Sequence, residues 1–290
     1  MLIPVFKGAI AALLALPLAG YAWLHFQRPA FVNKAETLFT GVIYRRYVSA
    51  VPRPYVMHVI SIDLSLSTVK AFVTAGSPGA GESEITAATT SEFLAQSGLQ
   101  IAVNASYFYP FLEDTPWNYF PHSGDGVNAL GIAISEGQRY SSAQTDWPAL
   151  CFSEQKAQIA TAGDCPPETV QAVAGRQVLV TEGLANPRLA QSKPYACVAV
   201  ALDRTGQQLQ LVVIDGKQPL YSEGVTKAEL AEILVELGAV SAIALDGGGS
   251  TTLVAETAAG PQLLNAPIHT KLPMRERAVA NHLGFSAAPR

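Results

Sequence analysis

Charged residues are scarce in this sequence, and no cluster of basic residues occurs in it. Asp, Glu, Lys and Arg make up 14% of the 290 residues, hydrophobic residues make up 49%, and the formal net charge is −4. Such a composition can bury a large core, which excludes long disordered segments. It also lacks the basic surface that binding to nucleic acid requires. The composition therefore favours a globular domain that binds a small molecule or a polymer other than nucleic acid.

Cysteine is also rare, with three residues in the chain and no zinc-ligand spacing among them. Cys151 and Cys165 flank a segment that can fold back on itself, and we expect them to form a disulfide in an oxidising compartment. The alternative is a pair of free cysteines in surface loops. Cys197 lies in an apolar run and is predicted to be a small core residue. No metal site and no organic cofactor is predicted.

One long uncharged run stands out at residues 8–26, next to Lys7. It is about long enough to span a bilayer as a helix, and Tyr21, Trp23 and Phe26 lie near its outer end. We interpret it as a membrane anchor, with a cleaved signal peptide as the alternative. The rest of the chain is then extracytoplasmic, either anchored through residues 8–26 or secreted. The predicted organisation is an anchor or signal at 1–27, a tether at 28–54 with a short helix around 34–44, and one domain at 55–290.

Short apolar runs separated by turn residues predict many strands and few helices within that domain. Capping boxes at Thr89–Glu92 and Thr226–Glu229 predict two helix starts, and the second helix is expected over 227–237. The fold class predicted is α+β, with a mixed β-sheet core and a few packed helices. The expected strands are 56–64, 68–73 (paired with the first), 99–103, 129–134, 177–180, 198–202, 209–214, 240–245, 251–255 and 262–264.

The segment most suggestive of chemistry is Asp246-Gly247-Gly248-Gly249-Ser250-Thr251, which follows the apolar run 240–245. A carboxylate at the end of a buried strand is held rigidly, and three glycines let a ligand approach the backbone closely. Successive N–H groups in such a loop can bind phosphate oxygens. No lysine follows the glycines, so a nucleotide P-loop is excluded. The alternative is a tight turn that Asp246 merely caps.

Two strings resemble the phosphodiester glycosidase family: VIDGKQPLYSEG at 213–224 and ALDGGGSTTLV at 244–254. The elements at 265–267 (NAP) and 275–281 (RERAVAN), and the segment 104–108, also look like family motifs, so the resemblance covers about residues 56–286. Three segments depart from the family pattern. Asn104-Ala105-Ser106 replaces Asn-Gly-Gly, Tyr195 lies where Arg-Thr-Ala is usual, and His269 ends the element that usually reads Asn-Arg-Pro-Ser-Asp.

The resemblance implies hydrolysis of the glycosidic C1–O bond between a sugar and a phosphodiester, in an envelope glycan or glycolipid. Phosphate is a good leaving group, so such a site needs a carboxylate and an anion cradle more than it needs an acid. Asp246 is assigned as nucleophile, base or electrostatic stabiliser, with Asp215 and Asn104 as further catalytic candidates. The alternatives are that Asp215 is a plain turn residue and that His269 is a surface histidine. Substrate and phosphate binding is assigned to Gly247, Gly248, Gly249, Ser250, Thr251, Arg277, Asn281 and His269.

Two other functions compete with this one. A non-catalytic envelope module that binds phosphorylated polysaccharide, or assists its assembly, would tolerate the three departures. A metal-dependent phosphodiesterase would use Asp246, Asp215 and Asn104 as hard oxygen ligands. The expected partners are a phosphorylated carbohydrate or glycolipid and, through the N-terminal segment, the membrane.

Overall fold

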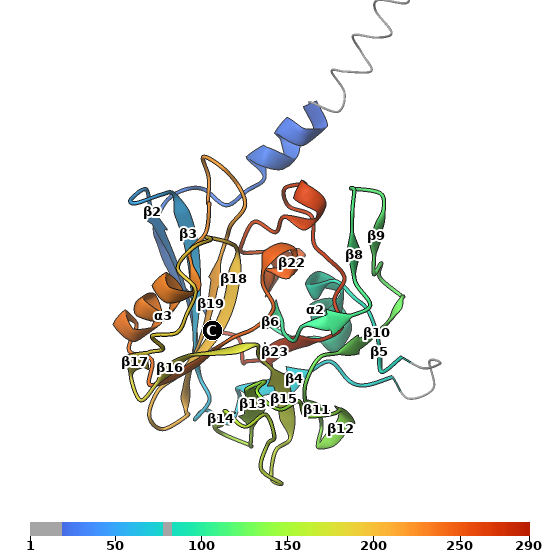
Figure 1. The fold of residues 1–290 in the computed structure, drawn as a ribbon, viewed down its shortest axis with the longest axis vertical. Coiled ribbons are helices and arrows are strands. Elements are labelled where there is room, and N and C mark those ends of the chain that lie inside the picture. The colour runs from blue at the N-terminus through green and yellow to red at the C-terminus, as the bar shows by residue number, and fades with distance from the viewer. Residues whose placement is uncertain (1–18, 78–82) are drawn as a thin grey trace, which may run out of the picture.

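The computed structural model describes residues 19–77 and 83–290 (Figure 1). Residues 19–26 are helical. Within the described ranges, no helix is both long and apolar enough to cross a bilayer. Most of the predicted anchor, residues 8–18, lies outside the described residues, so the anchor stays a prediction.

The largest element is an eight-stranded sheet, and the side chains of its central strands alternate between two buried faces. Along β18, for example, Val198 and Val200 point to one core while Cys197 and Ala199 point to the other. Burial on both faces explains why these strands read as continuous apolar runs. In order across the sheet, the strands are β1 (Lys34–Phe39), β2 (Val42–Ser49), β3 (Tyr55–Asp63), β19 (Gln208–Ile214), β18 (Cys197–Leu202), β20 (Ser241–Ala244), β16 (Gln177–Thr181) and β17 (Leu184–Ala185).

Strands β1 and β2 pair with each other, and β2 also pairs with β3. The tether and the short helix predicted within residues 28–54 are therefore wrong. Val42, Tyr44 and Arg46 are all buried, which is the period-2 pattern of a strand. Arg46 obscures that pattern because a charged residue occupies an inward position, where its Nε donates to the Val32 carbonyl at 3.0 Å. The folded domain therefore begins well before Tyr55.

A five-stranded sheet packs on one face of the eight-stranded sheet, and both contribute side chains to the main core. Helix α2 (Thr90–Ser97) covers its other face, and helix α3 (Lys227–Glu236) covers the far face of the larger sheet. Both predicted capping boxes are present, at Thr89 and Thr226. This sheet has the order β22 (Gly260–Leu263), β21 (Leu253–Thr257), β6 (Ile101–Asn104), β23 (His282–Ser286) and β4 (Lys70–Val73).

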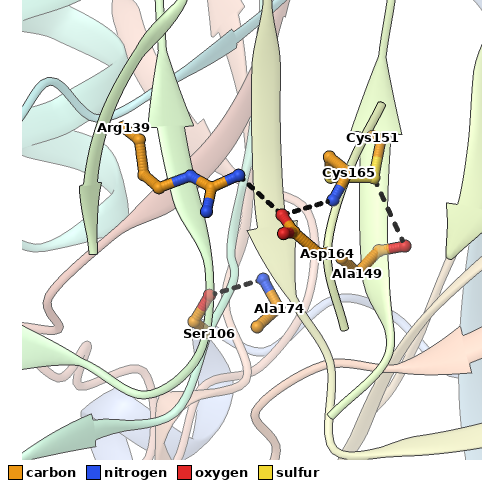
Figure 2. The surroundings of a disulfide bond; sticks show 7 residues. All are labelled: Ser106, Arg139, Ala149, Cys151, Asp164, Cys165 and Ala174. Atoms are coloured by element: carbon orange, nitrogen blue, oxygen red, sulfur yellow. Dashed lines mark hydrogen bonds and ion pairs between the residues drawn. A yellow bond between two sulfur atoms is a disulfide. The ribbon is translucent and has the colours of Figure 1, made fainter. Parts of the chain in front are cut away.

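The disulfide lies in a second five-stranded sheet, drawn in green and yellow at the bottom of Figure 1. Cys151 on β13 is bonded to Cys165, with 5.8 Å between their Cα atoms. Figure 2 shows this bond beside the contact of Ser106 with Ala174 on the neighbouring strand β15. The order is β12 (Gln138–Ser141), β11 (Ala133–Ser135), β15 (Gln171–Ala174), β13 (Ala149–Phe152) and β14 (Ala157–Ala160).

The remaining strands form two small sheets at the side of the molecule. The first joins β5 (Ile85–Thr86), β10 (Gly126–Ala129) and β7 (Phe108–Tyr109). The second is a hairpin of β8 (Leu112–Glu113) and β9 (Tyr119–Phe120), the pair of upright green strands in Figure 1. This hairpin brings Glu113 to Arg277.

The predicted mixed sheet is wrong, although the chain is one domain of mostly β-sheet with a few helices. All named strand pairs of the described residues are antiparallel. Strands β19 and β20 run parallel on either side of α3, but β18 lies between them and is antiparallel to both. The predicted pairing of 68–73 with the first strand is also wrong, because β4 pairs with β23 instead.

Candidate active site

Asp246 lies where the eight-stranded sheet meets the five-stranded sheet. It follows the end of β20, and its N–H donates to the Ala105 carbonyl at 2.9 Å, just beyond β6. The Asn104 Nδ2 donates to the Asp246 carbonyl at 2.8 Å, and its Oδ1 accepts from the Thr252 N–H at 3.0 Å. The buried Asn104 amide therefore holds both ends of the glycine loop. Its contacts make it a positioning residue for Asp246.

The glycine loop turns back tightly over Asp246. The Gly247 N–H donates to Asp246 Oδ1 at 2.9 Å, and Gly248 has a φ of +64°, which favours glycine. A Cβ on Gly249 would overlap the guanidinium of Arg277, and one on Gly248 would lie 3.3 Å from the Lys217 Nζ. The missing side chains thus make room for two cationic groups. Residues Gly248–Ser250 form the 3-10 turn η1.

Arg277 binds three residues around this loop. Its Nη1 donates to the Ser250 Oγ at 3.0 Å, its Nε donates to the His269 Nδ1 at 3.2 Å, and its Nη2 pairs with the Glu113 carboxylate. The residue is buried, and its charge lies close enough to Asp246 to affect the titration of that carboxylate. A buried guanidinium with this geometry suits bidentate binding of a phosphate.

Burial raises the pKa of Asp246 to about 6. The Ser250 hydroxyl, the charge of Arg277 and the Gly247 N–H each limit that rise, because they stabilise the carboxylate. Asp246 is therefore ionised at neutral pH but takes up a proton in mildly acidic solution. A strongly shifted carboxyl beside a specific charge partner is typical of a functional site.

His269 is buried beside Arg277, so the surface alternative for this histidine is wrong. Burial and the neighbouring Arg277 charge lower its pKa to about 4. Since Nδ1 accepts from Arg277, the proton of the neutral ring belongs on Nε2, which has no hydrogen-bond partner among the described residues. The edge of the ring meets Tyr119 at 4.7 Å between centroids. The geometry thus leaves one buried N–H donor free for a ligand.

Other polar atoms around the loop also lack partners within the described ranges. They are the Thr251 and Thr252 hydroxyls and the Tyr195 hydroxyl, all buried. An unpaired buried polar group costs about 1–3 kcal/mol, so several of them together indicate a place for a polar ligand or water.

Asp215 is held away from the loop in a buried network of its own. Its Oδ2 meets the His58 Nε2 at 3.2 Å, and its Oδ1 accepts from the Asn265 Nδ2 at 3.0 Å and from the Ala266 N–H at 2.9 Å. Asn265 in turn donates to the Thr251 carbonyl at 3.1 Å. Asp215 therefore reaches the glycine loop only through Asn265, and its contacts favour positioning over chemistry.

Asn281 and Ser106 are likewise turned toward each other. Asn281 Oδ1 accepts from the Ser106 N–H at 2.8 Å, and the Ser106 Oγ accepts from the Ala174 N–H at 3.1 Å. Ser106 thus points into the disulfide-bearing sheet rather than into the site, and Ala105 packs in the main core. The two departures from Asn-Gly-Gly are accommodated without filling the space around Asp246.

The sequence analysis missed Glu113, which completes the cluster around Arg277. Its Oε2 pairs with Arg277, and its Oε1 accepts from the Thr270 N–H at 2.9 Å. Thr270 has a φ of +53°, an unusual conformation for a threonine and a mark of a constrained site. No periodicity or motif around residue 113 signals this role, because the contact joins residues more than 150 positions apart.

Comparison with known proteins now identifies the family. The family model described as phosphodiester glycosidase matches residues 83–286. The chain belongs to the phosphodiester glycosidase family. The match covers most of the strands that hold the site, and the whole segment from Asn104 to Asn281.

Several solved structures share the fold of this chain, among them the following two. One is a hypothetical protein from Synechocystis, with 14% identity and a TM-score of 0.66, covering 89% of this chain and 64% of its own. The other is the catalytic domain of zebrafish N-acetylglucosamine-1-phosphodiester alpha-N-acetylglucosaminidase, auto-inhibited by its pro-peptide, with 19% identity and a TM-score of 0.63, covering 92% and 93%. This chain thus spans about two thirds of the first and nearly all of the second. No curated protein matches it significantly.

Proposed function

We propose that this phosphodiester glycosidase hydrolyses the C1–O bond between a sugar and a phosphodiester, with water as the acceptor. The observation that carries the proposal is that Asp246, a carboxylate with a pKa near 6, lies close to the buried guanidinium of Arg277, for which Gly249 leaves room. One group serves the sugar carbon, and the other serves the leaving phosphate.

The chemistry divides between these two parts of the site. Cleavage builds positive charge at C1 and returns a pair of electrons to the phosphate oxygen. The Asp246 carboxylate meets the first demand as nucleophile, as base for water or as electrostatic stabiliser. Arg277 meets the second, because a fixed cationic donor in a buried site stabilises developing negative charge. The free Nε2–H of His269 is a further donor toward the phosphate.

We further propose that the domain works outside the cytoplasm on an envelope glycan or glycolipid, held to the membrane by residues 8–26. The Cys151–Cys165 disulfide supports an oxidising compartment. The uncharged run at 8–26 supports an anchor by its length.

The proposal is tested with Asp246→Asn on a panel of synthetic sugar 1-phosphodiesters, with release of reducing sugar as the readout. We expect turnover by the wild type and a loss of at least about 1,000-fold in the variant, since the neutral amide neither attacks nor stabilises C1. Asp203→Asn, in the turn at the far end of β18, is the matched control and retains activity. Binding of the diesters without turnover by the wild type would replace the enzyme by a glycan-binding module.

A metal-dependent phosphodiesterase predicts a different result from the same assay. The oxygens of Asp215 and Asn104 are engaged in internal hydrogen bonds, and the described residues contain no group of three His, Cys, Asp or Glu side chains placed to hold a metal ion. Turnover that is unchanged by a chelator, and that releases the reducing sugar together with a phosphomonoester, supports the glycosidase. Loss of turnover with chelator and its return with a divalent cation would support the metal enzyme.

A further inference from the structure

Positive charge around the glycine loop exceeds what one phosphodiester needs. A phosphodiester carries a single negative charge, and the buried guanidinium of Arg277 is placed to bind it. Three more cationic side chains, Arg176, Lys217 and Lys227, lie near the loop, and none of them forms an ion pair with a carboxylate of the described residues. This surplus occurs on a chain whose formal net charge is −4. It therefore points to a second anion.

Lys227 lies on the side of the loop formed by helix α3. It is the first residue of that helix, and its Nζ is 5.4 Å from the centroid of the Tyr195 ring. The Tyr195 ring also lies beside the glycine loop, since its Cε2 is 3.3 Å from the position that a Cβ on Gly247 would occupy. The nearby charge of Asp246 opposes the effect of burial, which lowers the pKa of Lys227. Lys227, Tyr195 and Asp246 thus border one region.

Arg176, the residue before β16, reaches the same region. Its backbone N–H donates to the Ala244 carbonyl at 2.8 Å, so it lies beside the strand end that carries Asp246. Its guanidinium lies 4.6 Å over the Trp147 ring, which meets the Tyr107 ring edge-on at 5.8 Å. Both Arg176 and Asp246 influence the pKa of Tyr107, which burial raises. Arg176 and the rings of Trp147 and Tyr107 therefore border the same region as Lys227 and Tyr195.

The aromatic and cationic side chains around this region suit a charged sugar. Aromatic rings pack against the C–H faces of pyranoses, and the rings of Tyr195 and Trp147 both lie in this region. An ammonium and a guanidinium without acidic partners bind carboxylate or phosphate oxygens. Helix α3 needs no cation at its first turn, since its N-terminus is already capped by Thr226 and Glu229.

We propose that Lys227 and Arg176, with Tyr195 and Trp147, form a subsite for a sugar that bears a second anionic group, a carboxylate or a phosphate, on its ring. The inference rests on the proposed function, since it places this sugar beside Asp246, the carboxylate that acts at its C1. Lys217, next to Gly248, belongs to the phosphate side of the loop.

The test uses ethyl phosphodiesters of three sugar 1-phosphates that differ only at C6. These are glucose (neutral), glucuronic acid (carboxylate) and glucose 6-phosphate (phosphate). We expect kcat/KM for at least one charged substrate to exceed that for the neutral one by about tenfold or more. The ratio of kcat/KM for the charged substrate to kcat/KM for the neutral one falls to about 1 in Lys227→Gln and is reduced in Arg176→Gln. Lys156→Gln, an exposed lysine in the β13–β14 turn, is the matched control.

The two charged arms distinguish a carboxylate from a phosphate as the second anion. Equal kcat/KM for all three substrates, or an advantage that survives both substitutions, overturns the subsite. If the wild type turns over none of them, the proposed function fails instead. Calorimetric binding of the same compounds to Asp246→Asn, with and without Lys227→Gln, then decides the subsite independently. Unchanged melting temperatures of the Gln variants establish that the fold is intact.

Discussion

The Glu113 carboxylate binds the Arg277 guanidinium in the place that an anionic ligand would take. One oxygen pairs with Nη2 of Arg277, and the other accepts from the Thr270 N–H, as two oxygens of a phosphate would. Glu113 comes from the β8–β9 hairpin, which stands at the side of the fold (Figure 1). Its side chain is 27% exposed, while that of Arg277 is 7% exposed. An incoming phosphate therefore competes with a carboxylate of the protein itself.

Removing this competition is expected to strengthen anion binding. Glu113→Gln keeps the size of the side chain but loses its charge, so inorganic phosphate should bind about tenfold more tightly by calorimetry. Glu154→Gln, an exposed substitution in the β13–β14 turn, is expected to leave the affinity unchanged. Weaker phosphate binding in Glu113→Gln would mean that Glu113 orients Arg277 for the ligand rather than competing with it.

The pH profile of turnover is expected to report the ionisation of Asp246. The carboxylate is the active form, and its pKa is near 6, so kcat/KM should fall as the pH drops through about 6. Ser250→Ala removes a hydrogen bond that stabilises the carboxylate, which raises the pKa and moves the acid limb to higher pH. Ser153→Ala, at the surface, is the control. An acid limb that stays in place in Ser250→Ala would assign it to another group.

Sequence reasoning succeeded where the signal is local. Each capping box spans four residues and correctly gave the start of α2 or α3, and the apolar run before Asp246 correctly gave β20. It failed where the deciding contact is distant. The partner of β4 is β23, about 210 positions along the chain, and the role of Glu113 depends on Arg277, 164 positions away. Strand β2 was not predicted because Arg46, a charged residue, occupies one of its inward positions. There the Arg46 side chain donates to a backbone carbonyl instead of packing in an apolar core.

Asn104 is expected to matter mainly for stability and for the placement of Asp246. Asn104→Ala leaves the Asp246 carbonyl and the Thr252 N–H without their partners in a fully buried place. Each unpaired group costs about 1–3 kcal/mol, so the free energy of unfolding should fall by about 2–5 kcal/mol. Denaturant titration measures the loss, and turnover should fall at temperatures where the variant remains folded. Asn118→Ala, on the exposed β8–β9 turn, should cost less than about 1 kcal/mol.

The Cys151–Cys165 disulfide is expected to stabilise the fold without taking part in the chemistry. It closes a segment of 14 positions, and a loop of this length restricts the unfolded chain by about 3 kcal/mol. The double variant Cys151→Ser, Cys165→Ser should therefore unfold at lower denaturant concentration, and reductant should destabilise the wild type but not the variant. Turnover below the unfolding transition should persist, because β15 keeps the bond between the Ala174 N–H and Ser106 through its pairing with β13 and β11 (Figure 2). Turnover lost in a folded double variant would show that the disulfide also holds Ser106, and with it the segment that supports Asp246.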